Sequence, residues 1–288
     1  MSEEKTNLAL VKRDTVDVVA DRVRVFQENG ELHFPANYSP ENAMKAAWLV
    51  IQEVKDRNGK PALEVCTRDS VANALLNMVV QGLNPVKKQC YFIVYGNQLT
   101  LQRSYFGAMH IAKTVDPTIE DIVAEVVREG QTFRVSRVRG RTVVAEHEMQ
   151  LGDDSRPIVG AYCQVLYKDG TENTTIMSID EIKKAWSMSK TNPIGADGEV
   201  KATSTHGQFP AEMAKKTVVN RACKSIINTS GDDSLLVRAY RATQADIAEA
   251  EAREEIAANA NSRPILIDGD TGEVQDCPDP CTPADDLP

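Results

Sequence analysis

The chain has 288 residues, of which 42 are acidic and 33 are Lys or Arg, so its formal net charge is −9. No apolar run approaches the roughly 18 residues of a membrane span, and residues 1–7 lack the apolar stretch of a secretory signal. These features, with only six scattered cysteines, favour a cytoplasmic protein with reduced thiols and no disulfide framework.

Two helices are predicted after an N-terminal segment, 1–34, that shows no clear pattern and is a candidate for a role in assembly. The first helix begins at Pro40 after Ser39, a residue type that caps helices, and Asn58-Gly59 is expected to end it. The second begins near Thr67 and stops before a glycine, Gly82.

The pattern then changes to strands. Residues 90–103 form an expected hairpin around Gly96-Asn97, and a helix follows over 104–114. Residues 119–149 are expected to form further strands, and residues 159–177 a second hairpin around Asp169-Gly170.

Helices return in the last third of the chain. Ser178 and Glu181 form a capping box that opens a helix to Trp186. Residues 187–208 are expected to be a long loop, a length at which loops are often functional. Helices are expected over 210–231 and 234–258. The order predicts an α+β fold: a small, largely antiparallel β-sheet packed with helices, and helical N- and C-terminal parts.

The sequence contains no motif that argues for an enzyme. It has no phosphate-binding G-x-x-x-x-G-K-[ST] or G-x-G-x-x-G loop, no G-x-S-x-G elbow and no H-E-x-x-H zinc motif. Cys277 and Cys281 form a single pair, which is weak evidence for zinc. We therefore expect no catalytic residues, no metal site and no ATP site.

Charge is divided unevenly along the chain. Residues 243–288 hold twelve acidic residues and two arginines, whereas residues 1–242 hold 31 basic and 30 acidic residues. A near-neutral body can bind a polyanion where its basic residues cluster. The segment 246–288 is rich in Pro and Asp and poor in large apolar residues, which predicts a disordered acidic tail.

Basic residues cluster in two parts of the body, before and after the first hairpin and again over 183–224, where the net charge is +5. Most charged clusters are merely solvated surface, but here basic residues lie near aromatic ones, a combination that suits nucleic acid. On the helix over 210–231, Lys215 falls within the apolar arc, so it must extend to solvent, pair, or meet a ligand or a neighbouring subunit.

Residues 82–113 resemble the signature region of the RecT family, phage and prophage single-strand annealing recombinases related to the Redβ proteins. The matching features are Gly82-Leu83, Pro85, the run at 87–92, Tyr95-Gly96, and the helix with Tyr105, Gly107 and Ala112. Pro210 to Met213, Lys215-Lys216 and Arg221 also resemble the family, so the similarity covers about 35–245.

This resemblance implies an ATP-independent protein of homologous recombination that binds single-stranded DNA, anneals it and assembles as rings or helical filaments. It implies a fold similar to the core of Rad-type annealing proteins, with a DNA-binding and oligomerisation core over 35–245. A RecE-type 5′→3′ exonuclease is the expected partner, and a host single-strand binding protein is a candidate partner of the C-terminal part. The resemblance also implies that no cofactor is required. A divalent cation is a candidate modulator of annealing.

The residues expected to contact DNA, mainly through its backbone, are Lys87, Lys88, Arg103, Lys113, Lys184, Trp186, Lys190, Lys201, His206, Lys215, Lys216 and Arg221. Three other readings remain open: a nuclease, a structural phage protein, and a DNA-binding regulator that prefers one duplex sequence.

Overall fold

The computed structural model falls into two compact units, Met1–Ile247 and Ala248–Pro288. The residues it describes are 2–35, 37–189, 192–230, 235–245, 247, 266–267 and 274–275. In the second unit these are the two short paired strands β8 (Leu266–Ile267) and β9 (Val274–Gln275). The rest of the expected acidic tail lies outside the described residues, as does most of the helix expected over 234–258, of which 235–245 is described and helical.

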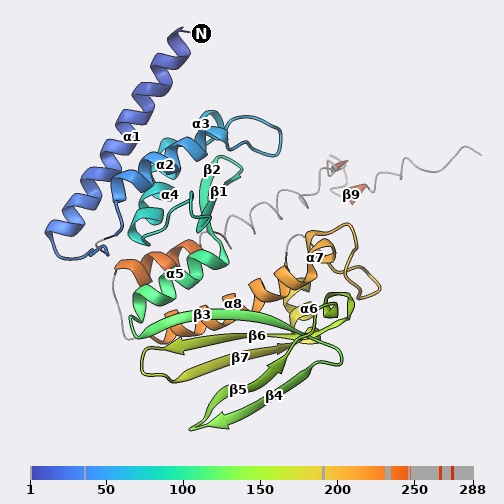
Figure 1. Ribbon diagram of the computed structural model, residues 1–288. Coiled ribbons are helices and arrows are strands. Elements are labelled where there is room, and N and C mark those ends of the chain that lie inside the picture. Colours follow the sequence, from blue (N-terminus) through green and yellow to red (C-terminus); the bar gives the residue numbers. More distant parts are fainter. Residues whose placement is uncertain are drawn as a thin grey trace, which may run out of the picture. The chain divides into compact units, whose positions relative to one another are not determined.

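Helices make up the first part of the large unit: α1 (Ser2–Glu28), α2 (Pro40–Glu53), α3 (Ala62–Val65) and α4 (Arg68–Val80). The Ser39 side chain accepts a hydrogen bond from the backbone of Asn42, which fixes the start of α2 as predicted. Trp48 of α2 is fully buried, and α1 packs on α2 and α4 (Figure 1).

A hairpin and a helix follow. Strands β1 (Cys90–Tyr95) and β2 (Gln98–Arg103) pair antiparallel, and Gly96 adopts φ 59° in the tight turn between them. The next helix, α5 (Tyr105–Val115), begins where the Ser104 hydroxyl accepts a hydrogen bond from the backbone of Gly107. These elements confirm the predicted hairpin and helix.

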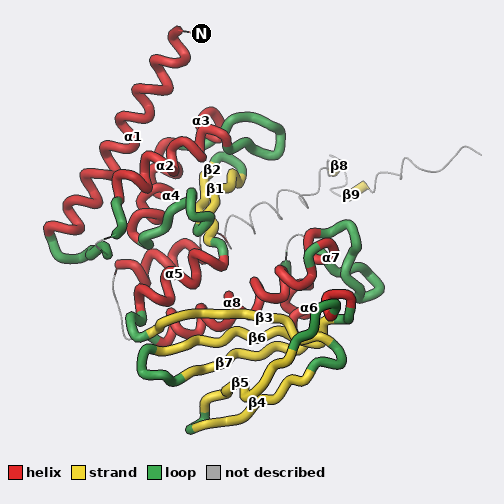
Figure 2. The backbone as a smooth tube through the Cα atoms, viewed as in Figure 1, coloured by secondary structure: helices red, strands yellow, loops and turns green. Residues whose placement is uncertain are grey.

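An antiparallel sheet forms the second layer, in the order β3 (Ile119–Arg128), β6 (Ile158–Tyr167), β7 (Glu172–Ser178). A separate hairpin, β4 (Thr132–Val138) with β5 (Arg141–Glu148), lies with β5 beside β7 (Figure 2). A 3-10 turn, Asp153–Ser155, precedes β6. Apolar residues of β6 such as Cys163 are buried towards the helices, as expected for a sheet with one covered face.

The last helices are α6 (Ile179–Ser187), α7 (Thr205–Gln208), α8 (Pro210–Thr229) and the helix over 235–245, and of these α6 and α8 pack on the sheet. The capping box of Ser178 and Glu181 is present in α6 as predicted. Helix α8 packs on all three strands of the sheet and on α5, so it joins the two parts of the unit. The fold is α+β, in agreement with the sequence.

One helix was not predicted, and two expectations about local structure were wrong. The N-terminal segment is mostly a 27-residue helix, α1, whose residues Val19 and Val23 are buried in the core. Helix α2 ends at Glu53, because Val54 turns to an extended conformation before the turn at Asn58-Gly59. The region 187–208 is not an unstructured loop, since it contains the bridge of Ile194 with Val200 and the helix α7.

The helix over 235–245 is held by a buried polar network. Gln81, fully buried at the end of α4, donates to the hydroxyl of Thr243 (3.0 Å) and accepts from the Arg103 guanidinium (2.7 Å). The same guanidinium lies 4.1 Å from the centroid of the Tyr240 ring. Arg103 therefore fastens the last described helix to α4 and β2.

We expect Arg103→Ala to lower the free energy of unfolding by about 2–3 kcal/mol, because it leaves the buried carbonyl of Gln81 without its donor. Chymotrypsin should then cut after Tyr240 at a concentration that leaves the unchanged chain intact. Arg141→Ala is the matched control, since Arg141 also meets a hydroxyl and a tyrosine ring but is exposed. Equal, small losses in both variants would contradict the role given to Arg103.

Among the residues that the structure describes, each helix is too short or too polar to span a bilayer.

Candidate nucleic-acid interface

An open pocket of about 460 Å³ lies between α5 and the segment that leads into β1. It brings together three of the lysines singled out from the sequence, Lys87, Lys88 and Lys113. The other lining residues are Val86, Gln89, Phe106, Met109 and His110. Cationic groups thus stand around a floor that is largely apolar.

The segment that carries two of these lysines is fixed by hydrogen bonds. The side chain of Gln89 accepts from the backbone of Asn84 (2.9 Å), and the Ser104 hydroxyl donates to the carbonyl of Lys88 (2.6 Å). Lys88 adopts φ 54°, in the left-handed region that residues other than glycine rarely occupy. Such conformations cost roughly 1 kcal/mol or more and often occur at functional sites.

Helix α5 supplies the opposite wall. Phe106, Met109, His110 and Lys113 lie at positions i, i+3, i+4 and i+7, so they share one face of the helix. Phe106 is 45% exposed, although its ring lies 4.0 Å from that of Tyr105. Sequence reasoning missed Phe106 and Met109, because an apolar stripe in a helix normally indicates core. The lysine that ends the stripe, Lys113, was the available signal.

The pocket is cationic at neutral pH. The side chains of Lys87 and Lys88 are exposed, and their ammonium groups have no hydrogen-bond or ion-pair partner among the described residues. Lys113 pairs with Asp121 of β3 (2.8 Å), an exposed pair that a competing anion can open at small cost. Burial lowers the pKa of His110, and the charge of Lys87 lowers it further.

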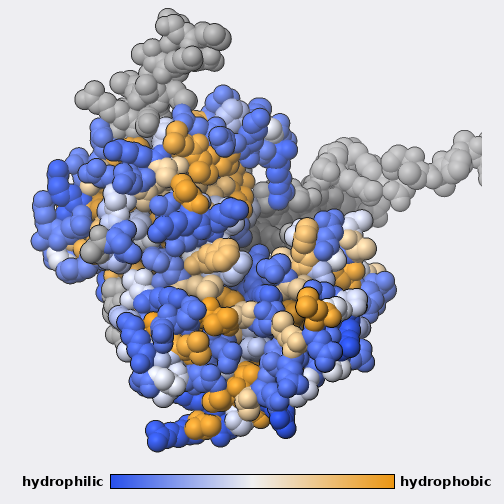
Figure 3. Space-filling model, viewed as in Figure 1, coloured by the Kyte–Doolittle hydropathy of each residue, from blue (hydrophilic) through white to orange (hydrophobic). Residues whose placement is uncertain are grey.

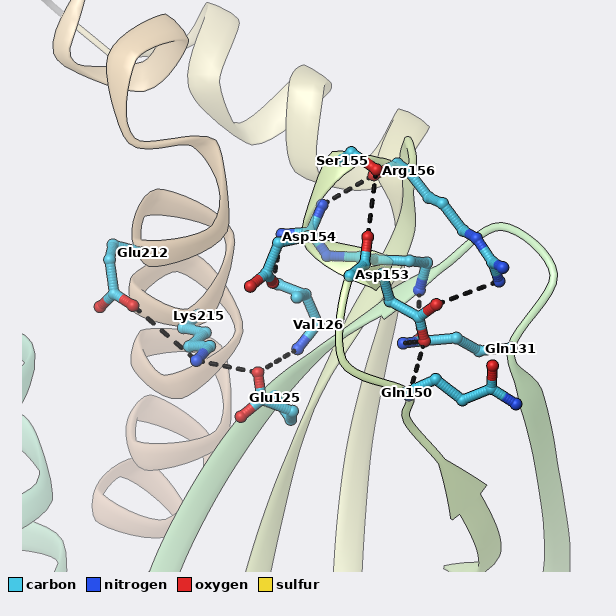
Figure 4. Close-up of polar contacts among 12 residues, drawn as sticks. Glu125, Val126, Gln131, Gln150, Asp153, Asp154, Ser155, Arg156, Glu212 and Lys215 are labelled. Carbon is cyan, nitrogen blue, oxygen red and sulfur yellow. Dashed lines mark hydrogen bonds and ion pairs between the residues drawn. The ribbon is translucent and has the colours of Figure 1, made fainter.

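Lys215, which lies on the apolar arc of α8, forms ion pairs within the protein. Its ammonium pairs with Glu125 of β3 (2.8 Å) and lies 3.8 Å from Glu212, one turn earlier in the helix (Figure 4). Glu212 and Lys215 also act electrostatically on the Tyr105 hydroxyl, whose pKa is raised mainly by burial. Lys215 thus lies where α8, β3 and the start of α5 meet, and its charge is matched within the protein.

A second cationic face is formed by α6 and α8. Lys184 and Lys216 are exposed there, and Arg221 pairs with Glu181 across the two helices (3.1 Å). Asn220 and Lys224 of α8 are exposed as well.

The region between α6 and α8 folds back on itself. Lys201 donates from its ammonium to the carbonyl of Asn192 (2.8 Å), and Lys183 of α6 pairs with Glu199 (2.9 Å). Lys201 is exposed near this turn, whereas Lys190 lies outside the described residues.

Three of the residues expected to contact DNA serve the interior instead. Trp186 is 3% exposed and its indole N–H donates to Thr217 of α8 (2.9 Å). His206 is 6% exposed and packs edge-on against Trp186, and its pKa is lowered mainly by burial. Their rings anchor α7 to α6 and α8. The structure therefore contradicts the predictions that Trp186 stacks on bases and that His206 contacts phosphate. Arg103 is engaged by Gln81 and Tyr240 as described above.

Hydrogen bonds and an ion pair hold the turn before β6 in place. Asp153 accepts hydrogen bonds from the side chain of Gln131 and the backbone of Gln150, both at 2.9 Å, and pairs with Arg156 (Figure 4). These contacts tie the turn to the segment that leads into β4. Within the described part of the chain no group of three or more His, Cys, Asp or Glu could hold a metal ion. Cys277 and Cys281 lie outside it.

Comparison with protein families gives one result that covers most of the chain. The model of the RecT family matches residues 41–258, about three quarters of the sequence. The match contains the lysine pocket, the sheet and both faces of α8. No curated protein matches the chain.

Proposed function

The chain belongs to the RecT family, whose members anneal single-stranded DNA in recombination, and from this we propose that it is an ATP-independent annealing protein that holds a strand by its phosphates. The observation that carries the proposal is the pocket of α5, where Lys87, Lys88 and Lys113 surround an apolar floor with an exposed phenyl ring. Lysines neutralise phosphates without reading sequence, and an aromatic face accepts any base or sugar.

The mechanism needs no nucleotide hydrolysis. A strand held by its backbone keeps its base edges free, so a second strand can test them by pairing. Each correct step of pairing contributes roughly 1.4 kcal/mol, which is enough to drive annealing once several steps have formed. Lysines that replace condensed counterions make the binding of the first strand dependent on salt.

The second cationic face extends the same surface chemistry. We assign Lys184, Lys216 and Arg221 to the backbone of DNA or to the acidic surface of a neighbouring subunit. Many subunits in a ring or helical filament would each contribute a weak contact and together hold the product firmly. Residues 35–245 would supply DNA binding and assembly. The 1–34 segment would assist assembly, and 246–288 would form the acidic tail.

The partners follow from the need for single strands. An exonuclease of the RecE type would expose them, and a host single-strand binding protein would meet the C-terminal part. The protein itself would need no catalytic residue and no cofactor, with a divalent cation acting only on the rate of annealing.

The direct test adds two complementary oligonucleotides one after the other, without ATP, at low and high salt. Fluorescence should show annealing that is faster than without protein and that slows as salt rises. A pair of non-complementary strands is the control. No acceleration, or degradation of the strands in the presence of magnesium, would contradict the proposal and favour a structural protein or a nuclease.

A further inference from the structure

The hairpin of β4 and β5 carries cationic side chains that the sequence analysis did not single out. Four arginines fall within the eight residues at its outer end: Arg134, Arg137, Arg139 and Arg141. Apolar side chains accompany them, since Val135 and Val138 are 48% and 53% exposed. Figure 3 shows hydrophilic and apolar surface side by side along this part of the molecule.

Two of the four arginines are engaged within the protein and two are available. Arg134 pairs with Glu146 across the hairpin. Arg141 donates to the Thr171 hydroxyl (3.0 Å) and lies over a tyrosine ring. Arg137 and Arg139 are exposed, and their guanidinium groups have no hydrogen-bond or ion-pair partner among the described residues.

The turn at the tip points to a use for Arg139 beyond folding. Val138 pairs with Arg141, so Arg139 and Gly140 form a two-residue turn, with φ 51° and 83°. Asn, Asp or Gly fits the first position of such a turn, where a long side chain is strained by roughly 1 kcal/mol. The local backbone therefore gives no reason for an arginine there, whereas a guanidinium that reaches a ligand does.

The hairpin and the lysine pocket lie at opposite edges of the sheet. Helix α5 contacts β3, whereas β5 lies beside β7 at the other edge (Figure 1). The strands β3, β6 and β7 lie between α5 and the hairpin, so one phosphate cannot contact both sites.

We propose that the β4–β5 hairpin is a second DNA contact, in which Arg137 and Arg139 bind the phosphate backbone of the incoming complementary strand. This proposal rests on the proposed function, which supplies a first strand held at α5. The planar guanidinium offers paired N–H donors that match the oxygens of a phosphate. The hairpin would thus stabilise the annealed product while leaving the first strand's contacts unchanged.

Charge on this hairpin also has a simpler explanation. Strand β4 is an edge strand that is exposed from Arg134 to Val138, and charged side chains keep such edges from pairing with other copies. That role accounts for Arg137 but not for Arg139, which lies in the turn beyond the strand. The two explanations predict different results when both charges are removed. A DNA contact predicts slower capture of the complementary strand, whereas edge protection predicts self-association of the protein.

The test is the double variant Arg137→Thr/Arg139→Asn, which keeps strand propensity at one site and suits the turn at the other. Its matched control is Arg22→Ala/Arg68→Ala, which removes two exposed arginines from α1 and α4. Each protein is titrated with a labelled single strand, and then the complementary strand is added at several salt concentrations.

The expected result is single-strand affinity within twofold of the unchanged protein, but roughly tenfold slower capture of the complementary strand. The salt slope for retention of the duplex should fall by about 1.8, which corresponds to two lost phosphate contacts. Unchanged capture would overturn the proposal, as would an equal loss of single-strand binding. Self-association with capture intact would assign the arginines to edge protection. If the unchanged protein does not anneal at all, the proposed function fails, and this is seen before any variant is compared.

Discussion

Replacing Lys87 by alanine and Lys88 by glycine will weaken single-strand binding by roughly ten- to a hundredfold at physiological salt without weakening the fold. Both ammonium groups stand free at the pocket of α5, so their loss removes two phosphate contacts. The slope of log affinity against log salt should become shallower by about 1.4, since each contact to a single strand contributes about 0.7.

The choice of glycine at residue 88 separates binding from stability. Lys88 adopts φ 54°, where glycine is unstrained, so Lys88→Gly should raise the free energy of unfolding by up to roughly 1 kcal/mol. The expected combination is a chain that unfolds at the same or a higher urea concentration and binds DNA less well. Such opposite changes are typical of a residue kept for function at some cost in stability.

The matched control is Lys45→Ala/Lys60→Ala, which removes two exposed lysines outside the pocket. It changes the net charge equally, so any general loss of attraction for DNA appears in both variants. Fluorescence anisotropy with a labelled oligonucleotide measures both. Equal affinities for the two double variants would show that the pocket does not hold the strand.

Local patterns in the sequence sufficed for most of the elements. The cap at Ser39, the turn at Gly96 and the capping box at Ser178 act over three or four residues, and all three are present in the structure. Helix α1 was missed because its apolar residues gain their order from packing on α2 and α4, which a short window does not contain.

The candidate site was less predictable, because burial depends on distant parts of the chain. Trp186 next to a polar region suggested a stacking platform, yet Thr217 and His206 enclose its ring. Arg103 suggested a phosphate contact, but the helix over 235–245 covers it. Lys87 and Lys88 were singled out as a basic pair before the first strand, and the structure leaves both side chains exposed.

Gly107→Ala will destabilise the protein by about 3 kcal/mol or more, although alanine is normally the better residue in a helix. A methyl group at this position of α5 would overlap the main-chain carbonyl oxygen of Gln89 and crowd the side chain of Leu83 (3.3 Å). Backbone cannot rotate away as a flexible side chain can, so α5 or the 84–89 segment must shift, as in other overpacked cores.

The direction of the change in the free energy of unfolding serves as the control for this variant. Within a helix, exchange of glycine for alanine ordinarily stabilises by roughly 0.5–1 kcal/mol, so a net loss in urea unfolding can only come from the close approach to Gln89. Because the displaced segment carries Lys87 and Lys88, we also expect weaker single-strand binding at a temperature where the variant is still folded. The free energy of unfolding and the affinity should therefore fall together, in contrast to Lys88→Gly, where they move in opposite directions. A stabilised Gly107→Ala variant with unchanged affinity would show that α5 does not press on the segment that positions these lysines.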